Sequence, residues 1–186
     1  MIGIIGAMGE EVQSLREQMN QVEEWKQASM IFWKGILCGK EVVVVRSGIG
    51  KVNAAVCAQI LIDKFQVDTL INTGIAGSLN ASIDIGDIVI SRDAVHHDMD
   101  AVGFGYEAGQ VPRMDAFSFA ADPDLVERAK AANEAENPEI GTYIGRVASG
   151  DQFVVSDELK KKIVSSFEAD CVEMEGVSIA QVAYLN

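Results

Sequence analysis

Residues 41–65 read EVVVVRSGIGKVNAAVCAQILIDKF, and this stretch decides the fold class. Residues 41–46 are a run of valines between charged residues, which is typical of a buried strand. The glycines of SGIG (47–50) turn the chain, and residues 51–65 then repeat apolar side chains at helical spacing, as at Val52, Val56 and Ile60. A strand, a glycine turn and a helix in that order indicate an α/β fold.

The same alternation continues on both sides of this stretch. Strands are predicted at residues 2–6, 30–38, 69–72, 85–91 (continuing toward 96) and 143–149, and helices at 10–20, 125–135 and 157–167. Residues 30–38 and 41–46 should form a hairpin that turns at Gly39-Lys40. We expect residues 98–119 to be a long excursion with a function or a partner contact, because such loops are uncommon in compact domains. No repeat, low-complexity tract or linker is visible, so residues 1–186 are predicted to be a single domain.

Charge and composition exclude several classes of protein. The chain has 28 acidic and 15 basic residues and a net charge of −13. Lys160-Lys161-Lys162 is expected to be a solvated helix face, so nucleic acid and anionic membranes are poor partners. No apolar run approaches the roughly 20 residues of a membrane-spanning helix, and the N-terminus lacks a signal-peptide pattern. The three cysteines are scattered in apolar contexts, which indicates reduced thiols in a cytoplasmic protein.

Three apolar strands end in glycine-rich turns, namely GAMG (6–9), SGIGK (47–51) and TGIAG (73–77). Glycine lets a backbone approach a ligand closely, and open α/β sheets bind ligands outside the carboxyl ends of their strands. We therefore predict a pocket lined by all three turns. The first turn does not match the GxGxxG dinucleotide fingerprint, and the second lacks the distant glycine and the Ser/Thr of a P-loop. Neither NAD nor ATP is indicated.

Carboxylates stand next to these turns and near the end of the sequence. Glu10 and Glu11 both favour the positive start of a helix, and one of them could also face the pocket as a general base. The segment VEMEG (172–176) places Glu173 and Glu175 between a short strand and an apolar helix. Because a buried glutamate is costly unless something pairs with it, this cluster indicates a binding site. Phe153 is either a core residue or a platform on which a planar base stacks.

Residues 96–100 read HHDMD, which has the composition of a metal site. Adjacent strand residues point to opposite faces, so at most one histidine shares a side with Asp98 or Asp100. The sequence has no other histidine, so we expect a hydrogen-bonded histidine at a contact surface and no metal. A Ser-His-Asp or Cys-His arrangement lacks a supporting local signature.

Seven segments, in one order and spanning nearly the whole chain, together resemble the 5'-methylthioadenosine/S-adenosylhomocysteine nucleosidases. They are GIIGAMGEEV (3–12), SGIGKVNAA (47–55), NTGIAGS (72–78), GDIVIS (86–91), HDMDAVGFGYEAGQVP (97–112), SGDQF (149–153) and VEMEG (172–176). The resemblance implies a nucleoside phosphorylase-like α/β fold: a three-layer sandwich with a central mixed, mostly parallel sheet flanked by helices. It also implies hydrolysis of the bond between adenine and a 5'-thio-substituted ribose, with no cofactor and no metal. The preferred 5' substituent does not follow from it.

The same resemblance implies roles for individual residues. Glu11 matches the glutamate that holds and deprotonates the attacking water, and Glu175 matches the carboxylate that binds the ribose hydroxyls. Such hydrolysis passes through an oxocarbenium-like state, which carboxylates stabilise. Met174 would pack beneath the sugar, Phe153 would stack on adenine, and Val154 would offer its backbone to the base edge. The remaining walls would consist of Ala7, Met8, Ile49, Ile75, Ala76, Gly77 and, as a supporting residue, Glu173.

The resemblance also implies a partner. Members of the family are homodimers, and Phe104 and Pro112 match residues that reach into the partner's pocket around the 5'-thio substituent. This gives the excursion at residues 98–119 a role.

The family pattern continues beyond the VEMEG helix into another apolar strand, a Ser-Asp pair and a final helix. That aspartate supplies a proton to adenine N7, and no residue of this sequence matches it. We expect residues 1–186 to be part of a longer, active enzyme, because losing a central strand would leave sheet edges exposed. Two alternatives stay open. One is a purine nucleoside phosphorylase, although Glu11 would repel phosphate and Arg46 is the one nearby cation. The other is a nucleoside-binding protein without catalysis.

Overall fold

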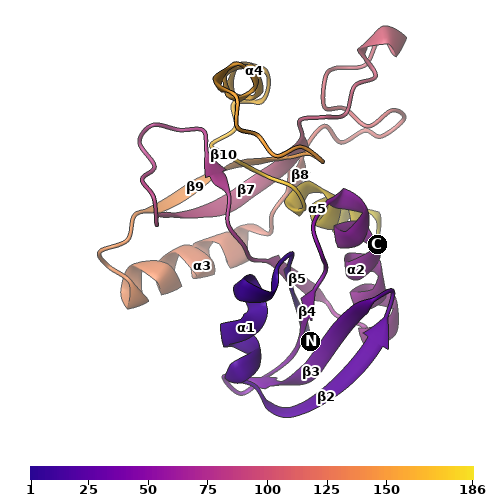
Figure 1. The fold of residues 1–186 in the computed structure, drawn as a ribbon, viewed down its shortest axis with the longest axis vertical. Helices are drawn as coiled ribbons and strands as arrows, with labels where there is room; N and C mark the ends of the chain where they lie inside the picture. The colour runs from indigo at the N-terminus through magenta and orange to yellow at the C-terminus, as the bar shows by residue number, and fades with distance from the viewer. The chain divides into compact units, whose positions relative to one another are not determined.

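The computed structural model describes residues 1–186, which divide into two compact units. The first unit comprises Met1–Ile75 and Gln181–Asn186, and the second comprises Ala76–Ala180. Each unit contains a five-stranded sheet with helices packed on it, which confirms the predicted α/β fold (Figure 1). None of the helices combines the length and the apolar character needed to cross a membrane.

The sheet of the first unit has the strand order β2-β3-β4-β1-β5. Its strands are β1 (Ile2–Gly6), β2 (Asn20–Gln27), β3 (Met30–Leu37), β4 (Lys40–Arg46) and β5 (Thr69–Asn72). Strand β1 is parallel to β4 and β5, whereas β2, β3 and β4 are antiparallel neighbours. The predicted hairpin is confirmed, but its two-residue turn is Cys38-Gly39, with left-handed φ angles of 48° and 75°.

Strand β2 is not among the predicted strands. It lies at the edge of the sheet and all of its residues are exposed. An edge strand without a buried face needs no alternation of apolar and polar residues, so NQVEEWKQ carries no strand pattern. Its charged side chains, Glu23, Glu24 and Lys26, also discourage pairing with another chain.

Helices α1 (Gly9–Glu17) and α2 (Lys51–Phe65) cover opposite faces of this sheet. Ile4 and Val44 pack with Val12 of α1. Gly3, in contrast, lies so close to Leu61 of α2 that a Cβ at position 3 would be 3.0 Å from the leucine Cδ1. Adjacent strand residues point to opposite faces, so the two helices enclose the centre of the sheet from both sides. This is why the whole valine run of β4 is buried.

The sheet of the second unit has the order β6-β10-β9-β7-β8. Its strands are β6 (Gly77–Ser78), β7 (Ile88–His96), β8 (Phe119–Ala120), β9 (Thr142–Ser149) and β10 (Cys171–Glu173), and its helical segments are η1 (Val102–Phe104), α3 (Pro123–Glu136), α4 (Asp157–Phe167) and the first part of α5 (Gly176–Leu185). The central strands β10, β9 and β7 are parallel, and the outer pairs are antiparallel. The sheets are therefore mixed, as predicted, but they are not mostly parallel, because antiparallel pairs are as frequent as parallel ones.

The core of the second unit lies on both faces of this sheet. Val95 of β7 and Ala148 of β9 pack with side chains of α4 on one face. The adjacent Ala94 packs with Val177 of α5 on the other face. Helix α4 has the bounds that the sequence predicts, because Ser156 caps it by accepting a hydrogen bond from the N–H of Leu159 at 3.2 Å.

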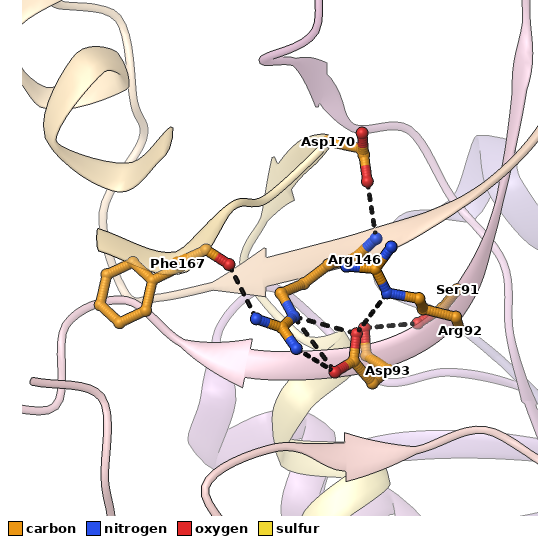
Figure 2. Close-up of polar contacts among 6 residues, drawn as sticks. All are labelled: Ser91, Arg92, Asp93, Arg146, Phe167 and Asp170. Carbon is orange, nitrogen blue, oxygen red and sulfur yellow. Dashed lines mark hydrogen bonds and ion pairs between the residues drawn. The ribbon is translucent and has the colours of Figure 1, made fainter. Parts of the chain in front are cut away.

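An ion pair joins β7 to β9 inside the second unit (Figure 2). Arg146 donates from Nε to both carboxylate oxygens of Asp93, at 3.0 and 3.1 Å, and from Nη2 to Oδ2 at 2.6 Å. Its Nη1 donates to the carbonyl of Phe167, the last residue of α4, at 2.9 Å. The backbone N–H of Arg146 donates to Asp170 at 2.9 Å. One arginine therefore fixes two strands and the end of a helix.

The excursion at residues 98–119 contains one short helix, η1, before the two-residue strand β8. Gly109, with a φ of 87°, brings the chain back toward β7. Its N–H donates to the carbonyl of Met99 at 2.8 Å, and a Cβ at this position would lie 2.6 Å from the carbonyl oxygen of His96. The excursion is therefore tied to the end of β7.

Candidate active site

The glycine turns of the first unit meet at one edge of its sheet. Because β1 is parallel to β4 and to β5, the carboxyl ends of the three strands lie side by side. The N–H of Ser47 donates to the carbonyl of Gly6 at 2.9 Å, and the N–H of Thr73 donates to that of Ile5 at 2.9 Å. The structure thus brings residues 6–9, 47–50 and 73–75 together, as the sequence predicts.

Glu11 points its carboxylate into the angle between two of these turns. Its Oε2 accepts hydrogen bonds from the N–H groups of Ala7 at 2.7 Å and Met8 at 2.9 Å, and its Oε1 accepts one from the N–H of Ile75 at 3.1 Å. Gly74 makes this placement possible, because a Cβ there would lie 2.6 Å from Oε1. Three donors fix the carboxylate: Oε2 accepts two of them and Oε1 accepts one, so Oε1 has a second lone pair for a further donor such as water.

The two glutamates of α1 have different surroundings. Met8 is the N-cap of the helix, and Glu11 at the third helical position reaches back to the N-cap N–H. Glu10 is exposed. Of the two residues, Glu11 is therefore the one that the fold holds against the glycine turns.

A cleft of about 520 Å³ opens beside the first two turns and contains no residue of the third, so it differs from the predicted pocket lined by all three turns. It is lined by Ala7, Met8, Gly9, Glu10, Ala28, Ser29, Met30, Arg46, Ser47, Gly48, Ile49 and Asn53. Three of the predicted wall residues, Ala7, Met8 and Ile49, are among them. Arg46 is the only cationic residue of this lining, and Glu10 is the only anionic one.

In the second unit, Glu173 holds the start of α5. Its Oε2 accepts hydrogen bonds from the N–H groups of Glu175 at 2.8 Å and Gly176 at 2.7 Å. Its Oε1 accepts a short hydrogen bond from the hydroxyl of Ser149. The Ser149 oxygen in turn accepts from the N–H of Val177 at 2.8 Å. Both oxygens of Glu173 therefore serve the junction of β9, β10 and α5, which is the structural basis of a supporting role.

The other predicted residues of VEMEG and of the preceding loop differ in exposure. The side chain of Glu175 is buried, with 8% of its surface exposed, and Met174 is half-buried. Phe153 is 82% exposed and is not a core residue. Val154, the next residue, packs against the core beneath α4. The exposed ring of Phe153 is therefore followed directly by a residue, Val154, that the core holds in place.

The remaining predicted residues of the second unit lie on the surface. Ala76 and Gly77 are exposed, and Gly77 pairs with Val172 through β6 and β10. Phe104 is 88% exposed at the end of η1, and Pro112 is exposed in the same excursion.

The two histidines of the HHDMD segment make contacts within the second unit. His96 is buried, and its ring meets Phe119 edge to face at a centroid distance of 6.2 Å. The backbone N–H of His97 donates to the carbonyl of Ser149 at 2.9 Å, which continues the β7–β9 ladder by one step. The structure contains no group of three or more His, Cys, Asp or Glu side chains arranged to hold a metal ion.

Comparison with known proteins supplies the family. Residues 1–186 match the family model of the phosphorylase superfamily. The 5'-methylthioadenosine/S-adenosylhomocysteine nucleosidase of Staphylococcus aureus strain JH9 is 45% identical over 185 residues, which are 99% of this chain and 80% of that protein. The chain belongs to the 5'-methylthioadenosine/S-adenosylhomocysteine nucleosidase family.

Solved structures of nucleosidases show the same fold. The enzyme from Colwellia psychrerythraea 34H in complex with adenine is 43% identical, with a TM-score of 0.94 over 99% of this chain and 76% of that chain. The enzyme from Neisseria meningitidis in complex with methylthio-immucillin-A is 42% identical, with a TM-score of 0.94 over 99% of this chain and 79% of that chain. The nucleoside phosphorylase-like fold implied by the sequence resemblance is confirmed.

Three residues that contact predicted site residues or their loops, one in the first unit and two in the second, receive no role from the sequence. Gly74 leaves room for the Glu11 carboxylate, Ser149 joins Glu173 to α5, and Asp98 accepts a hydrogen bond from the N–H of Asp151 at 2.8 Å. All three lie inside motifs visible in the sequence. Their roles depend on contacts with residues far away in the chain. In the sequence, each is marked only as a small or polar residue at the end of a strand.

Proposed function

We propose that this chain hydrolyses the N-glycosidic bond of 5'-methylthioadenosine and S-adenosylhomocysteine, releasing adenine and the 5-thio-substituted ribose. The observation that carries the proposal is the Glu11 carboxylate, held by three backbone amides against the glycine turns. It stands in a chain that is 45% identical to a nucleosidase of that name. Relatives with the same fold bind adenine and methylthio-immucillin-A.

Glu11 acts as the general base. The water donates one proton to the carboxylate while its oxygen bonds to the anomeric carbon, and the bond from that carbon to adenine breaks. The electron pair of the broken bond leaves with the base, which takes up a proton and departs as neutral adenine. Backbone amides suit this role because they orient the carboxylate without placing a cation beside it. A cation there would pair with the carboxylate in place of the water. The adjacent walls are formed by Ala7, Met8, Ile49 and Ile75.

The VEMEG segment binds the ribose. Glu175 is buried, and sugar hydroxyls are donors that a buried carboxylate binds well. Glu173 holds the N–H of Glu175 and thereby its position at the start of α5. Met174 supplies an apolar surface beneath the sugar.

The loop after β9 binds the base. Phe153 has a ring that is largely exposed, and an exposed aromatic ring is suited to stacking on adenine. Val154, anchored in the core beneath α4, offers its backbone to the edge of the base. Ala76 and Gly77 complete the wall.

The same proposal includes a homodimer in the cytoplasm. Phe104 and Pro112 are exposed on the excursion and would reach into the pocket of a second copy around the 5' substituent. Burial raises the pKa of the Cys57 and Cys171 thiols to about 12, so both stay protonated. Free thiols, two of them buried, suit a reducing compartment.

The test is adenine release from methylthioadenosine by the wild type, Glu11→Gln and Glu17→Gln. Replacing the base should lower kcat by about 10²- to 10⁴-fold, while adenine affinity stays near that of the wild type. Glu17 lies in the last turn of the same helix and is exposed, so its variant controls for a change of charge on α1. Full activity of Glu11→Gln would contradict the assignment.

Product analysis separates the two alternative functions. Adenine release that requires phosphate and yields a ribose 1-phosphate would identify a phosphorylase, for which Arg46 would be the cation of the cleft. Tight binding of adenine with no release from the nucleoside would identify a binding protein. Phosphate-independent release of free thioribose is the expected result.

A further inference from the structure

The parallel strands β7 and β9 are clamped by an aspartate at each end. Before the strands begin, Asp87 accepts a hydrogen bond from the N–H of Gly141 at 2.9 Å. Beyond their ends, Asp98 accepts one from the N–H of Asp151 at 2.8 Å. Both contacts join a carboxylate to a backbone amide, and they are separated by the length of the strands, about 25 Å.

The second clamp lies in closely packed surroundings. The N–H of His97 donates to the carbonyl of Ser149 at 2.9 Å, directly before the clamp. A Cβ on Gly150 would collide with the imidazole of His97 and would lie 3.0 Å from Cγ of Asp98. A glycine at position 150 therefore lets the segment after β7 press against the segment after β9.

The two clamps lead into different segments of the chain. Phe153 stands two residues after Asp151, in residues 150–156, which have no helix or strand. Beyond the ring, Val154 packs against the core and Ser156 caps α4. The exposed ring therefore lies between an anchor made by Asp98 and an anchor made by the core. Gly141, in contrast, leads only into β9.

We propose that Asp98 is a positioning residue for adenine binding, which acts by holding residues 150–154 so that Phe153 presents its ring to the base. This inference rests on the proposed function, which assigns the ring to adenine. A hydrogen bond to an ionised acceptor is shorter and stronger than one between neutral groups. Without it, the loop must be ordered when the base binds, and that cost reduces affinity.

The experiment measures adenine binding by calorimetry, and KM and kcat for methylthioadenosine, in Asp98→Ala, Asp98→Asn and Asp87→Ala. Asp98→Ala should weaken adenine binding about tenfold, and it should raise KM more than it lowers kcat. Asp98→Asn keeps an oxygen that accepts from Asp151 but loses the charge, so it should recover part of the affinity. Asp87→Ala removes the matched clamp and should lower the melting temperature without changing adenine affinity.

A double-mutant cycle tests whether Asp98 acts through the ring. Adding Asp98→Ala to Phe153→Ala should change adenine affinity by less than about twofold, because the group being positioned is gone. If Asp98→Ala does not fold by circular dichroism, Asp98→Glu replaces it, because its longer side chain misplaces the acceptor and should weaken adenine binding about threefold.

Three results would overturn the proposal: unchanged adenine affinity in Asp98→Ala or Asp98→Glu, no recovery in Asp98→Asn, or an equal loss in Asp87→Ala. The adenine measurements need no turnover. A wild type that binds adenine but does not cleave methylthioadenosine would therefore refute the proposed reaction and leave the role of Asp98 to be decided by its own variants.

Discussion

The ion pair between Asp93 and Arg146 gives the sharpest prediction for stability. Asp93→Asn keeps the shape of the side chain but removes its charge. The side chains of the pair are 11% and 19% exposed, so the arginine would stay charged with little access to water. Removing one partner of a buried pair costs about 3–5 kcal/mol. Arg146 keeps its hydrogen bond to the carbonyl of Phe167, so we expect a loss at the low end, about 3 kcal/mol, which lowers the melting temperature by roughly 6–12 °C.

The pH dependence of this loss follows from the pKa of Asp93. Burial acts to raise that pKa, but hydrogen bonds from Arg146 and Ser118 and the nearby arginine charges outweigh it, so the pKa lies below its ordinary value. A carboxyl with a depressed folded pKa stabilises the protein fully above its unfolded pKa, about 3.9, and loses this contribution as the pH falls through the folded pKa. The difference between wild type and Asp93→Asn should therefore be constant from pH 5 to 8 and shrink below about pH 4.

Thermal unfolding followed by circular dichroism from pH 3 to pH 8 checks both statements. Asp68→Asn is the matched control, because Asp68 also forms an ion pair, with the terminal amino group, but is itself exposed. Solvent screens such a pair, so no measurable change in melting temperature is expected. If Asp93→Asn is as stable as the wild type at pH 7, or if the difference grows on acidification, the reasoning about this pair is wrong.

Three further predictions concern glycine, serine and the hairpin turn. Gly74→Ala should lower kcat about 100-fold in the adenine-release assay, because a Cβ 2.6 Å from Oε1 of Glu11 displaces the carboxylate; unchanged kcat would contradict the assigned geometry. Ser149→Ala should lower the melting temperature by roughly 4–8 °C, since it removes a buried hydrogen-bonding group worth about 2 kcal/mol; an unchanged melting temperature would show that the hydroxyl is dispensable. Ala28 and Ser29 have φ angles of 49° and 62° in a two-residue hairpin turn, a left-handed conformation that Asn and Gly adopt more readily. Ala28→Asn with Ser29→Gly should therefore raise the free energy of unfolding in urea by about 1 kcal/mol. A loss of stability would show that the two residues are not strained.

The parts of the fold that the sequence predicts correctly have strong local signals. The valine run of β4 and helix α4 with its serine cap can be identified within ten or so residues of sequence. Strand β2 cannot, because its residues are all exposed and its only constraint is pairing with β3. Local sequence patterns indicate which residues are buried, and an edge strand without a buried face has no such pattern.

The site shows the same limit at the level of single contacts. The sequence displays SGDQF and VEMEG as separate motifs, but it does not show that parallel pairing places Ser149 opposite Glu173. Nor does local charge show which of Glu10 and Glu11 faces the glycine turns, because both are favourable in the first turn of a helix; in the sequence only the family resemblance selects Glu11. Helical geometry decides this, since the third residue of α1 reaches back to its N-cap.

Glu11 and Glu173 have the same local arrangement but different proposed roles. Each accepts two backbone N–H groups at the start of a helix through one oxygen, which fixes the carboxylate without a cation. The difference lies at the second oxygen. At Glu173 the hydroxyl of Ser149 donates to it and also joins α5, so the carboxylate belongs to the packing of the fold. At Glu11 the adjacent residue is Gly74, which has no side chain, and the second oxygen accepts the N–H of Ile75. A glycine at position 74 therefore lets the carboxylate lie directly against the third turn, and the remaining lone pair of Oε1 is the acceptor that a water molecule would use in the proposed reaction.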